Sequence, residues 1–350
     1  MLSKEFHNVK ISGIACAVPA NKVMTDSYKE HFGEAVVERF KKATGIESRY
    51  ISDGKQTISD LSFVAAEALI KSKGLTGADF DAVILVTQTA DYKIPSTSYL
   101  LHKRLGIKQD CLVFDINLGC SGFVNGVYFL AGLIESGTIE RALLLVGDSD
   151  TNHQVTDDTS FTMMFGDASS ATIIEKGNGV IRGMIRSDGE GFNTLITPVP
   201  GSRFPGVLSP EEVGLQKKMD GDDVFLFTIT KIPRLFKEFY KTFDCDEADF
   251  DYYILHQANL MIVNQIAKKL KLPSEKVPIS LNEYGNTDGS SVPVGIVDLC
   301  EKNKIKEKIK LITSGFGIGL SWGIVSFDID TNDVLPMIVT DDYYAEGKNV

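Results

Sequence analysis

Cys120 is the residue of this sequence that is best placed for covalent chemistry. It lies in DINLGCSGFVNGVYFLAGLIESG, where an apolar strand pattern ends and a long apolar helix pattern begins just after the cysteine. The unpaired N–H groups and the positive dipole end at a helix start stabilise a thiolate, the nucleophilic form of cysteine. Its small neighbours Gly119, Ser121 and Gly122 would let a substrate approach the sulfur. This context favours a nucleophile, and a cysteine that merely packs a helix start is the structural alternative.

His256 and Asn286 are the polar side chains that we expect beside Cys120. His256 follows the strand pattern DYYIL, and the carboxyl ends of buried strands are where open α/β sheets bind ligands. Asn286 lies in SLNEYGNTDGSSVPVGIV, in a run of small residues that leads into a helix pattern. A structural histidine and an ordinary Gly-Asn turn are the alternatives for these two positions.

An internal repeat indicates which elements bring these residues together. Phe80 and Phe250 each open a buried-strand pattern, and Gly119 and Gly289 each begin a small-residue turn into a helix, so both pairs are 170 residues apart (80 to 250, 119 to 289). Each half is predicted to form β-α-β-α-β followed by a closing pair of strands. The turn that carries Asn286 is then equivalent to the turn that carries Cys120. We expect the two turns to face each other across a pseudo-twofold axis.

Composition and charge limit the classes of protein to which the chain can belong. With 43% hydrophobic and 24% charged residues, the sequence is typical of a globular protein with a large core. No run of about 18 apolar residues is free of charge, and MLSKEFHNVKISG has no apolar signal-peptide region, so we expect no membrane span and a cytoplasmic location. The net charge of −11 argues against a nucleic-acid partner. The five scattered cysteines lack C-x-x-C spacing, which predicts neither a disulfide framework nor a metal site.

Four segments in one order resemble the β-ketoacyl-acyl-carrier-protein synthase III group. They are the turn around Cys120, HQAN at 256–259, GNTDGSSVP from Gly285 and SGFGIGLSWG from Ser314. The resemblance extends over roughly the whole chain to about residue 330. It implies an α/β protein with the five-layered α-β-α-β-α thiolase fold, built from two pseudo-repeated halves, and a homodimer. We expect an N-terminal half at 1–180 that carries the cysteine, a C-terminal half at 181–330 that carries the histidine and asparagine, and an acidic tail at 331–350.

The resemblance also implies a reaction that needs no cofactor. Cys120 would take an acyl group from an acyl-coenzyme A or acyl-carrier-protein thioester, with the backbone N–H groups of Cys120 and Ile318 as the oxyanion hole. A malonyl thioester, with malonyl-acyl-carrier-protein as the expected donor, would then lose carbon dioxide. His256 and Asn286 would stabilise the resulting enolate, which attacks the acyl-Cys120 carbonyl and forms a 3-oxoacyl product. The acyl carrier protein is therefore an expected partner.

Further residues are assigned to the substrate by the same resemblance. Substrate-binding residues are expected at Ile94, Phe165, Asn259 and Phe316, with Ile94 at the position of the gate of the acyl pocket. The lysines expected to dock the carrier protein are Lys268, Lys269 and Lys271, although a solvated helix end explains them equally well. Arg39 and Thr159 stand near the positions where family members clamp the adenine of coenzyme A between a tryptophan and an arginine. The loss of this clamp, together with the small Ile94, predicts a medium-chain acyl group delivered on a carrier protein.

Two other functions remain open on the sequence. A thiolase-fold acyltransferase could pass the acyl group from Cys120 to an oxygen, nitrogen or sulfur nucleophile without forming a carbon–carbon bond. A non-catalytic partner subunit could keep the fold without the reaction. Asn286 favours condensation over the first, since simple acyl transfer needs no enolate stabiliser, and the combination of cysteine, histidine and asparagine argues against the second. A thiolase proper would need a second cysteine near GFGIG, and the sequence has none there.

Overall fold

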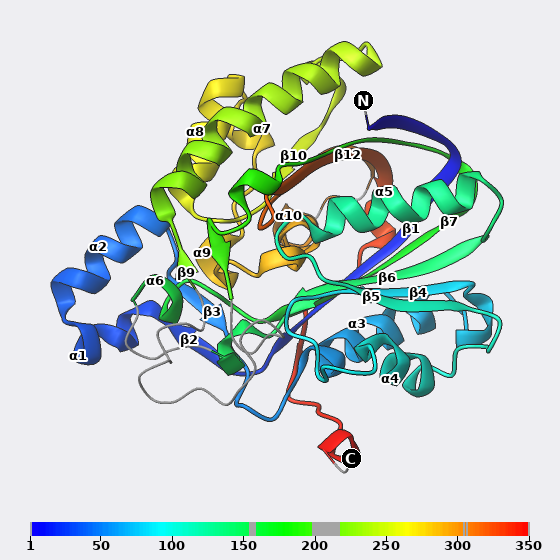
Figure 1. Cartoon of the computed structure of the whole chain (residues 1–350), viewed down its shortest axis with the longest axis horizontal. Helices are drawn as coiled ribbons and strands as arrows, with labels where there is room; N and C mark the ends of the chain where they lie inside the picture. The colour runs from blue at the N-terminus through cyan, green and yellow to red at the C-terminus, as the bar shows by residue number, and fades with distance from the viewer. Residues whose placement is uncertain (1, 154–158, 198–217, 304, 306, 349–350) are drawn as a thin grey trace.

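The computed structural model describes residues 2–153, 159–197, 218–303, 305 and 307–348 of the chain (Figure 1). Its strands are β1 Ser3–Pro19, β2 Lys22–Met24, β3 Ser48–Tyr50, β4 Ala82–Val86, β5 Leu112–Ile116, β6 Arg141–Asp148, β7 Ala168–Ser187, β8 Leu195–Ile196, β9 Lys218–Met219, β10 Tyr252–Leu255, β11 Lys308–Gly317, β12 Ser321–Asp330 and β13 Ile338–Thr340. Its helices are α1 Lys29–Phe32, α2 Glu34–Thr44, α3 Ile58–Ser72, α4 Thr97–Arg104, α5 Gly122–Glu135, α6 Thr159–Thr162, α7 Gly221–Phe243, α8 Leu260–Leu270, α9 Leu281–Tyr284 and α10 Ser291–Asn303.

Two long antiparallel strands, β1 and β7, join the two parts of a mixed sheet. The strand order is β10-β11-β12-β7-β6-β4-β5, with β1 beside β7. The first residues of β1 pair with the last part of β7, next to β12, and its later residues pair with the first part of β7, next to β6. The register shifts at Asn8, which has a positive φ of 59°. The expected boundary at residue 180 falls inside β7, and the division into halves stays a prediction.

Three layers of helices alternate with the two parts of the sheet. Alternate residues of β4 point to opposite faces, so Val83 packs with α3 and α4 while Ile84 packs with α5 and α10. The same central layer also covers β11 and β12, whose other face packs on α7 and α8. Figure 1 shows α3 and α4 on one side of the molecule, α7 and α8 on the other, and α5 and α10 between them. The predicted five-layered α-β-α-β-α thiolase fold is confirmed.

The predicted repeat is visible in local detail. Strands β4 and β10 begin 170 residues apart, at Ala82 and Tyr252. Each is preceded by a short 3-10 turn with a capping box, Thr76 with Asp79 in the first half and Asp246 with Asp249 in the second. Phe80 and Phe250, the next residues after these turns, are both completely buried. The two halves therefore start their buried strands in the same way.

The second half departs from the predicted pattern at 277–280. This segment lies between α8 and α10, as β5 lies between α4 and α5 in the first half, yet the structure assigns no strand to it. Pro278 has no N–H to donate to a strand ladder, so regular pairing is interrupted. Side-chain hydrogen bonds of Gln257 take the place of part of the missing strand pairing. Its Nε2 contacts the Pro278 carbonyl at 3.5 Å, and its Oε1 accepts from Ser280 N at 3.1 Å. The Gln257 amide thus links this irregular segment to the end of β10.

The described part of the acidic tail packs on the rest of the molecule. Strand β13 pairs in parallel with the end of β1, with Ala17 opposite Ile338. Beyond it, Gln56 Nε2 donates to the Asp342 carbonyl at 2.8 Å, and Tyr344 N donates to Asp60 Oδ1 at 2.8 Å. Within the described residues, no helix has the length and hydropathy needed to cross a membrane.

Candidate active site

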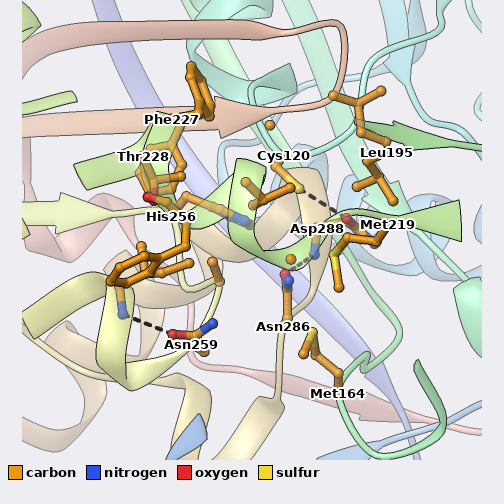
Figure 2. Close-up of a pocket in the computed structure, with 18 of the residues that line it drawn as sticks. Cys120, Met164, Leu195, Met219, Phe227, Thr228, His256, Asn259, Asn286 and Asp288 are labelled. Carbon is orange, nitrogen blue, oxygen red and sulfur yellow. Dashed lines mark hydrogen bonds between the residues drawn. The ribbon is translucent and has the colours of Figure 1, made fainter. Parts of the chain in front are cut away.

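The structure brings Cys120, His256 and Asn286 together in one pocket (Figure 2). Each lies near the carboxyl end of a strand or in the turn that leads into a central helix, as the repeat predicts. The same pocket is lined by the expected oxyanion-hole residue Ile318 and by all but one of the expected substrate-binding residues, namely Phe165, Asn259 and Phe316. The exception is Ile94, which lies between β4 and α4, is 84% exposed and does not line this pocket.

Cys120 lies in the turn between β5 and α5, with 6% of its surface exposed. The neighbouring Gly317 leaves room for the sulfur, because a Cβ there would lie 3.1 Å from Cys120 Sγ and 2.8 Å from its Cβ. A Cβ at Gly315 would likewise lie only 2.9 Å from the carbonyl oxygen of Cys120. The GFG segment at the end of β11 therefore packs directly against the cysteine, and only glycine at 317 keeps the sulfur open to a substrate.

His256 is held from three sides. Its backbone N donates to Ser314 O at 2.8 Å, and its Nδ1 lies 2.6 Å from the Ser291 hydroxyl. Its ring packs edge-on against the Phe316 ring, with 5.2 Å between the ring centroids. Burial lowers the pKa of His256 to about 3, and a contact with the backbone of Asp288 only partly opposes this. The imidazole is therefore neutral at pH 7 and acts as a hydrogen-bonding group without a positive charge.

The orientation of Asn286 is set by its neighbours. Its backbone forms a bridge with Phe165, in which Asn286 N donates to Met164 O at 2.9 Å and Asn286 O accepts from Gly166 N at 3.0 Å. Its side-chain oxygen accepts from the backbone N of Asp288 at 3.0 Å. Because the oxygen is engaged in this way, the amide nitrogen is the end of the side chain that can donate to a substrate.

Asp288 also belongs to the site, although sequence analysis did not select it. Its Oδ1 accepts a hydrogen bond from Cys120 Sγ at 3.1 Å, and the residue is only 4% exposed (Figure 2). It has a positive φ of 45°. Next to it, a Cβ at Gly289 would lie 2.9 Å from the Gly119 carbonyl, so the two equivalent turns face each other as expected. An acidic residue in the turn equivalent to that of Cys120 was the signal available in the sequence.

Much of the pocket wall is apolar, and this feature too was missed by sequence analysis. Its side chains come from segments far apart in the sequence, and they include Met164, Leu195, Met219, Phe227 and Leu320. Among the described residues that line the pocket, the ionisable ones are Cys120, His256 and Asp288, and none is a lysine or arginine. Such a wall suits a flexible apolar chain, since methionine side chains adapt to irregular shapes. No cluster of three or more metal-ligating residues is found within the described ranges.

Helix α8 connects the pocket to the surface. Asn259 caps its first turn, accepting from Ile262 N at 2.8 Å, and Met261 beside it lines the pocket. The three predicted docking lysines lie at the opposite end of the helix. All three lysines are exposed, and Lys269 Nζ also donates to Ile229 O of α7 at 2.9 Å.

Comparison with known proteins places these features in a family context. A family model described as 3-oxoacyl-[acyl-carrier-protein (ACP)] synthase III matches residues 114–189, and the model of its C-terminal part matches residues 242–329. A putative 3-oxoacyl-[acyl-carrier-protein] synthase 3 of Campylobacter jejuni is 33% identical, covering 95% of this chain and 98% of the relative. The β-ketoacyl-[acyl-carrier-protein] synthase III of Methylococcus capsulatus is 30% identical over 90% of this chain and 97% of its own. The crystal structure of a 3-oxoacyl-(acyl-carrier protein) synthase from Burkholderia xenovorans superposes with a TM-score of 0.90 at 32% identity, covering 97% and 99% of the two chains.

Proposed function

Since the chain belongs to the 3-oxoacyl-[acyl-carrier-protein] synthase III family of condensing enzymes, we propose that it joins an acyl thioester to a malonyl thioester through an acyl-Cys120 intermediate. The observation that supports this most is the pocket itself. It combines a cysteine at a helix start, a neutral histidine and an oriented asparagine amide beside an apolar wall. No lysine, arginine or metal cluster among the described lining residues competes with this assignment.

In the first half-reaction the sulfur of Cys120 attacks the acyl thioester. A bond forms between Sγ and the acyl carbon, and the carbonyl oxygen becomes an oxyanion. We assign the backbone N–H groups of Cys120 and Ile318 to this oxyanion, since Ile318 follows Gly317 at the sulfur. Collapse of the intermediate breaks the original thioester bond, releases the donor thiol and leaves acyl-Cys120.

In the second half-reaction a malonyl thioester loses carbon dioxide. The electron pair of the broken carbon–carbon bond moves into an enolate, whose oxygen would accept hydrogen bonds from the Asn286 amide and from Nε2 of His256. Nε2 is the ring nitrogen assigned to the substrate because Nδ1 is engaged by Ser291. The enolate carbon attacks the acyl carbonyl, and Cys120 leaves as the 3-oxoacyl product forms.

The acyl donor is proposed to carry a medium-length chain on a carrier protein, and the malonyl donor to be malonyl-acyl-carrier-protein. The apolar wall formed by Met164, Leu195 and Met219 supports a chain longer than acetyl. The acidic carrier is proposed to contact three exposed lysines at the far end of the helix that starts at the pocket, Lys268, Lys269 and Lys271. Competition between acetyl and octanoyl donors, each on coenzyme A and on carrier protein, tests both variables. Faster labelling of Cys120 by acetyl-coenzyme A than by all alternatives would contradict this choice of donor.

A homodimer through the edge strand β5 is part of the proposal. Strand β5 pairs with β4 alone, and all its residues retain some exposure, whereas those of β10 at the opposite edge are mostly buried. The first N–H groups of α4, at Thr97 and Ser98, donate to Asp115 of β5, so the exposed Ile94 lies close to this edge. In such a dimer the gate predicted for Ile94 would act on the pocket of the partner subunit.

The proposed function is tested by weighing the intact protein after exposure to acyl thioesters. The adduct should map to Cys120 and be absent from Cys120→Ala. His256→Ala and Asn286→Ala should still be acylated, while the 3-oxoacyl product falls by about 10²–10³ or more for each, because each donor acts where enolate charge develops. Full condensing activity in Asn286→Ala would favour acyl transfer to an oxygen, nitrogen or sulfur nucleophile. Absence of any adduct would favour a non-catalytic subunit.

A further inference from the structure

We propose that Asp288 is a catalytic residue of the acylation half-reaction, which takes the proton of the Cys120 thiol and then delivers it to the departing thiol. This inference rests on the proposed acyl-Cys120 intermediate. The contact that carries it is the 3.1 Å hydrogen bond from Cys120 Sγ to Asp288 Oδ1, formed by two side chains that are 6% and 4% exposed.

Among the described residues that line the pocket, Asp288 is the carboxylate in direct contact with the thiol. His256, the other ionisable group of the described lining, has its Nδ1 at the Ser291 hydroxyl, and burial disfavours its protonated form. The described lining contains no lysine or arginine that could stabilise a permanent thiolate. The start of α5 favours the thiolate, but a helix dipole moves no proton. A carboxylate in direct contact with the thiol can accept the proton and keep it near the reacting sulfur.

The turn from Asn286 to Asp288 holds the carboxyl group in place. Asp288 N donates to the side-chain oxygen of Asn286, and the close approach of Gly289 to the Gly119 carbonyl fixes the turn against the turn of Cys120. One backbone segment therefore orients both side chains, and Figure 2 shows the Asp288 carboxyl directed at the Cys120 sulfur. This arrangement would couple the group used in acylation to the group used in condensation.

In this step the proton of the Cys120 thiol passes through Asp288 to the donor sulfur. As the bond between Sγ and the acyl carbon forms, the thiol proton moves to Oδ1 of Asp288, and the thioester oxygen becomes the oxyanion. When the carbon–sulfur bond to the donor breaks, the Asp288 carboxylic acid gives that proton to the donor sulfur. The products are acyl-Cys120, a neutral donor thiol and the regenerated carboxylate. No oxidant, reductant or further co-reactant is required.

The test compares acylation rates of Asp288→Asn and the unmodified protein in single turnovers followed by intact mass, from pH 5.5 to 9. The change keeps the shape of the side chain and removes its basicity. We expect acylation at pH 7 to fall by about 10²–10⁴, the usual contribution of a general base. The remaining rate should rise with pH across this range, because hydroxide from solution then takes the thiol proton in place of Asp288. Asp298→Asn is the matched control, because Asp298 is also 4% exposed but pairs with Lys302 on α10, and it should leave the rate unchanged.

A second measurement varies the leaving thiol and uses the unmodified protein as well. With Asp288 present, alkyl and aryl thioesters should acylate Cys120 at similar rates, because the proton is supplied to either leaving group. In Asp288→Asn the aryl thioester, whose thiol is more acidic, should react much faster than the alkyl one. If Asp288→Asn does not fold, a strong preference of the unmodified protein for the aryl thioester would still refute proton delivery.

The outcomes separate this inference from the proposed function. An unchanged rate in Asp288→Asn, or a uniformly lower rate with the pH profile of the unmodified protein, would overturn the role of Asp288 and leave acyl-Cys120 intact. Failure of every thioester to label Cys120 in the unmodified protein would instead reject the proposed function.

Discussion

At the scale of single residues, the neutrality of His256 has a direct kinetic consequence. Its pKa of about 3 means that the imidazole stays uncharged down to roughly pH 4, so protonation of this ring would reduce activity only below that pH. We expect the condensation of pre-formed acyl-Cys120 with a malonyl thioester to show no His256 titration between pH 5 and 8. Single-turnover rates across this range check the expectation. A midpoint near pH 6.5 that disappears in His256→Gln would contradict it.

Gly317 gives a second prediction at this scale. A Cβ at 317 would lie 2.8 Å from Cys120 Cβ and 3.1 Å from Sγ, both closer than side-chain atoms normally approach. Gly317→Ala should therefore slow acylation of Cys120 by at least tenfold, by pushing the sulfur out of line. Gly221→Ala is the control, because Gly221 also lines the pocket and a Cβ there meets nothing within 4 Å. Equal acylation rates in the two variants would show that the sulfur tolerates the added methyl group.

At the scale of secondary-structure elements, variants of Asn259 can separate its helix cap from its predicted contact with the substrate. Its side chain caps α8, and its position in the pocket supports the predicted contact with the substrate. Asn259→Ala should lower the free energy of unfolding by about 1 kcal/mol, while Asn259→Ser, which keeps a capping oxygen, should lower it much less. Urea unfolding measures both.

Activity then distinguishes the substrate contact from the cap. Asp220 caps α7 through Asp223 N and does not line the pocket, so Asp220→Ala is the matched control for stability alone. We expect Asn259→Ser to lose condensing activity although its stability is kept. Asp220→Ala should keep its condensing activity although its stability falls. Full activity in Asn259→Ser would limit Asn259 to its capping role.

At the scale of the whole molecule, the exposed edge of β5 predicts the oligomeric state. Leu112 on this strand and Phe129 on α5 are each 40% exposed, and the Phe129 ring lies 6.0 Å from that of Phe114. A second copy can pair with such an edge about a twofold axis and cover these side chains. The purified chain should therefore be a dimer by light scattering coupled to gel filtration.

Substitutions at the edge provide the control for this prediction. Phe129→Lys should shift the mass toward the monomer, because it places a charge on the apolar surface beside β5. Leu226→Lys, at an apolar position of α7 that is 58% exposed, should leave the dimer intact. A monomeric unmodified protein, or equal effects of the two substitutions, would place the interface elsewhere or remove it.

Much of the fold could be predicted because it depends on local patterns that repeat. Buried-strand patterns at Phe80 and Phe250, small-residue turns and their common offset predicted the order of strands and helices in each half and placed Cys120 and Asn286 in facing turns, and the family resemblance implied the five layers. The irregular segment at 277–280 was not predicted, since a side chain, Gln257, takes over part of the pairing there. Ile94 was assigned to the pocket by resemblance alone, and the structure places it on the surface of the single chain.

The sequence by itself determined the fold class and singled out Cys120, His256 and Asn286 as neighbours, because the internal repeat and the family resemblance suffice for these. Only the tertiary structure decided that Asp288 points at Cys120 and that Met164, Leu195 and Met219 line the same pocket. The direction of Asp288 depends on a positive φ and on contact between two turns that are distant in the chain. A pocket wall depends on which distant segments pack side by side, and no local pattern of residues encodes that packing.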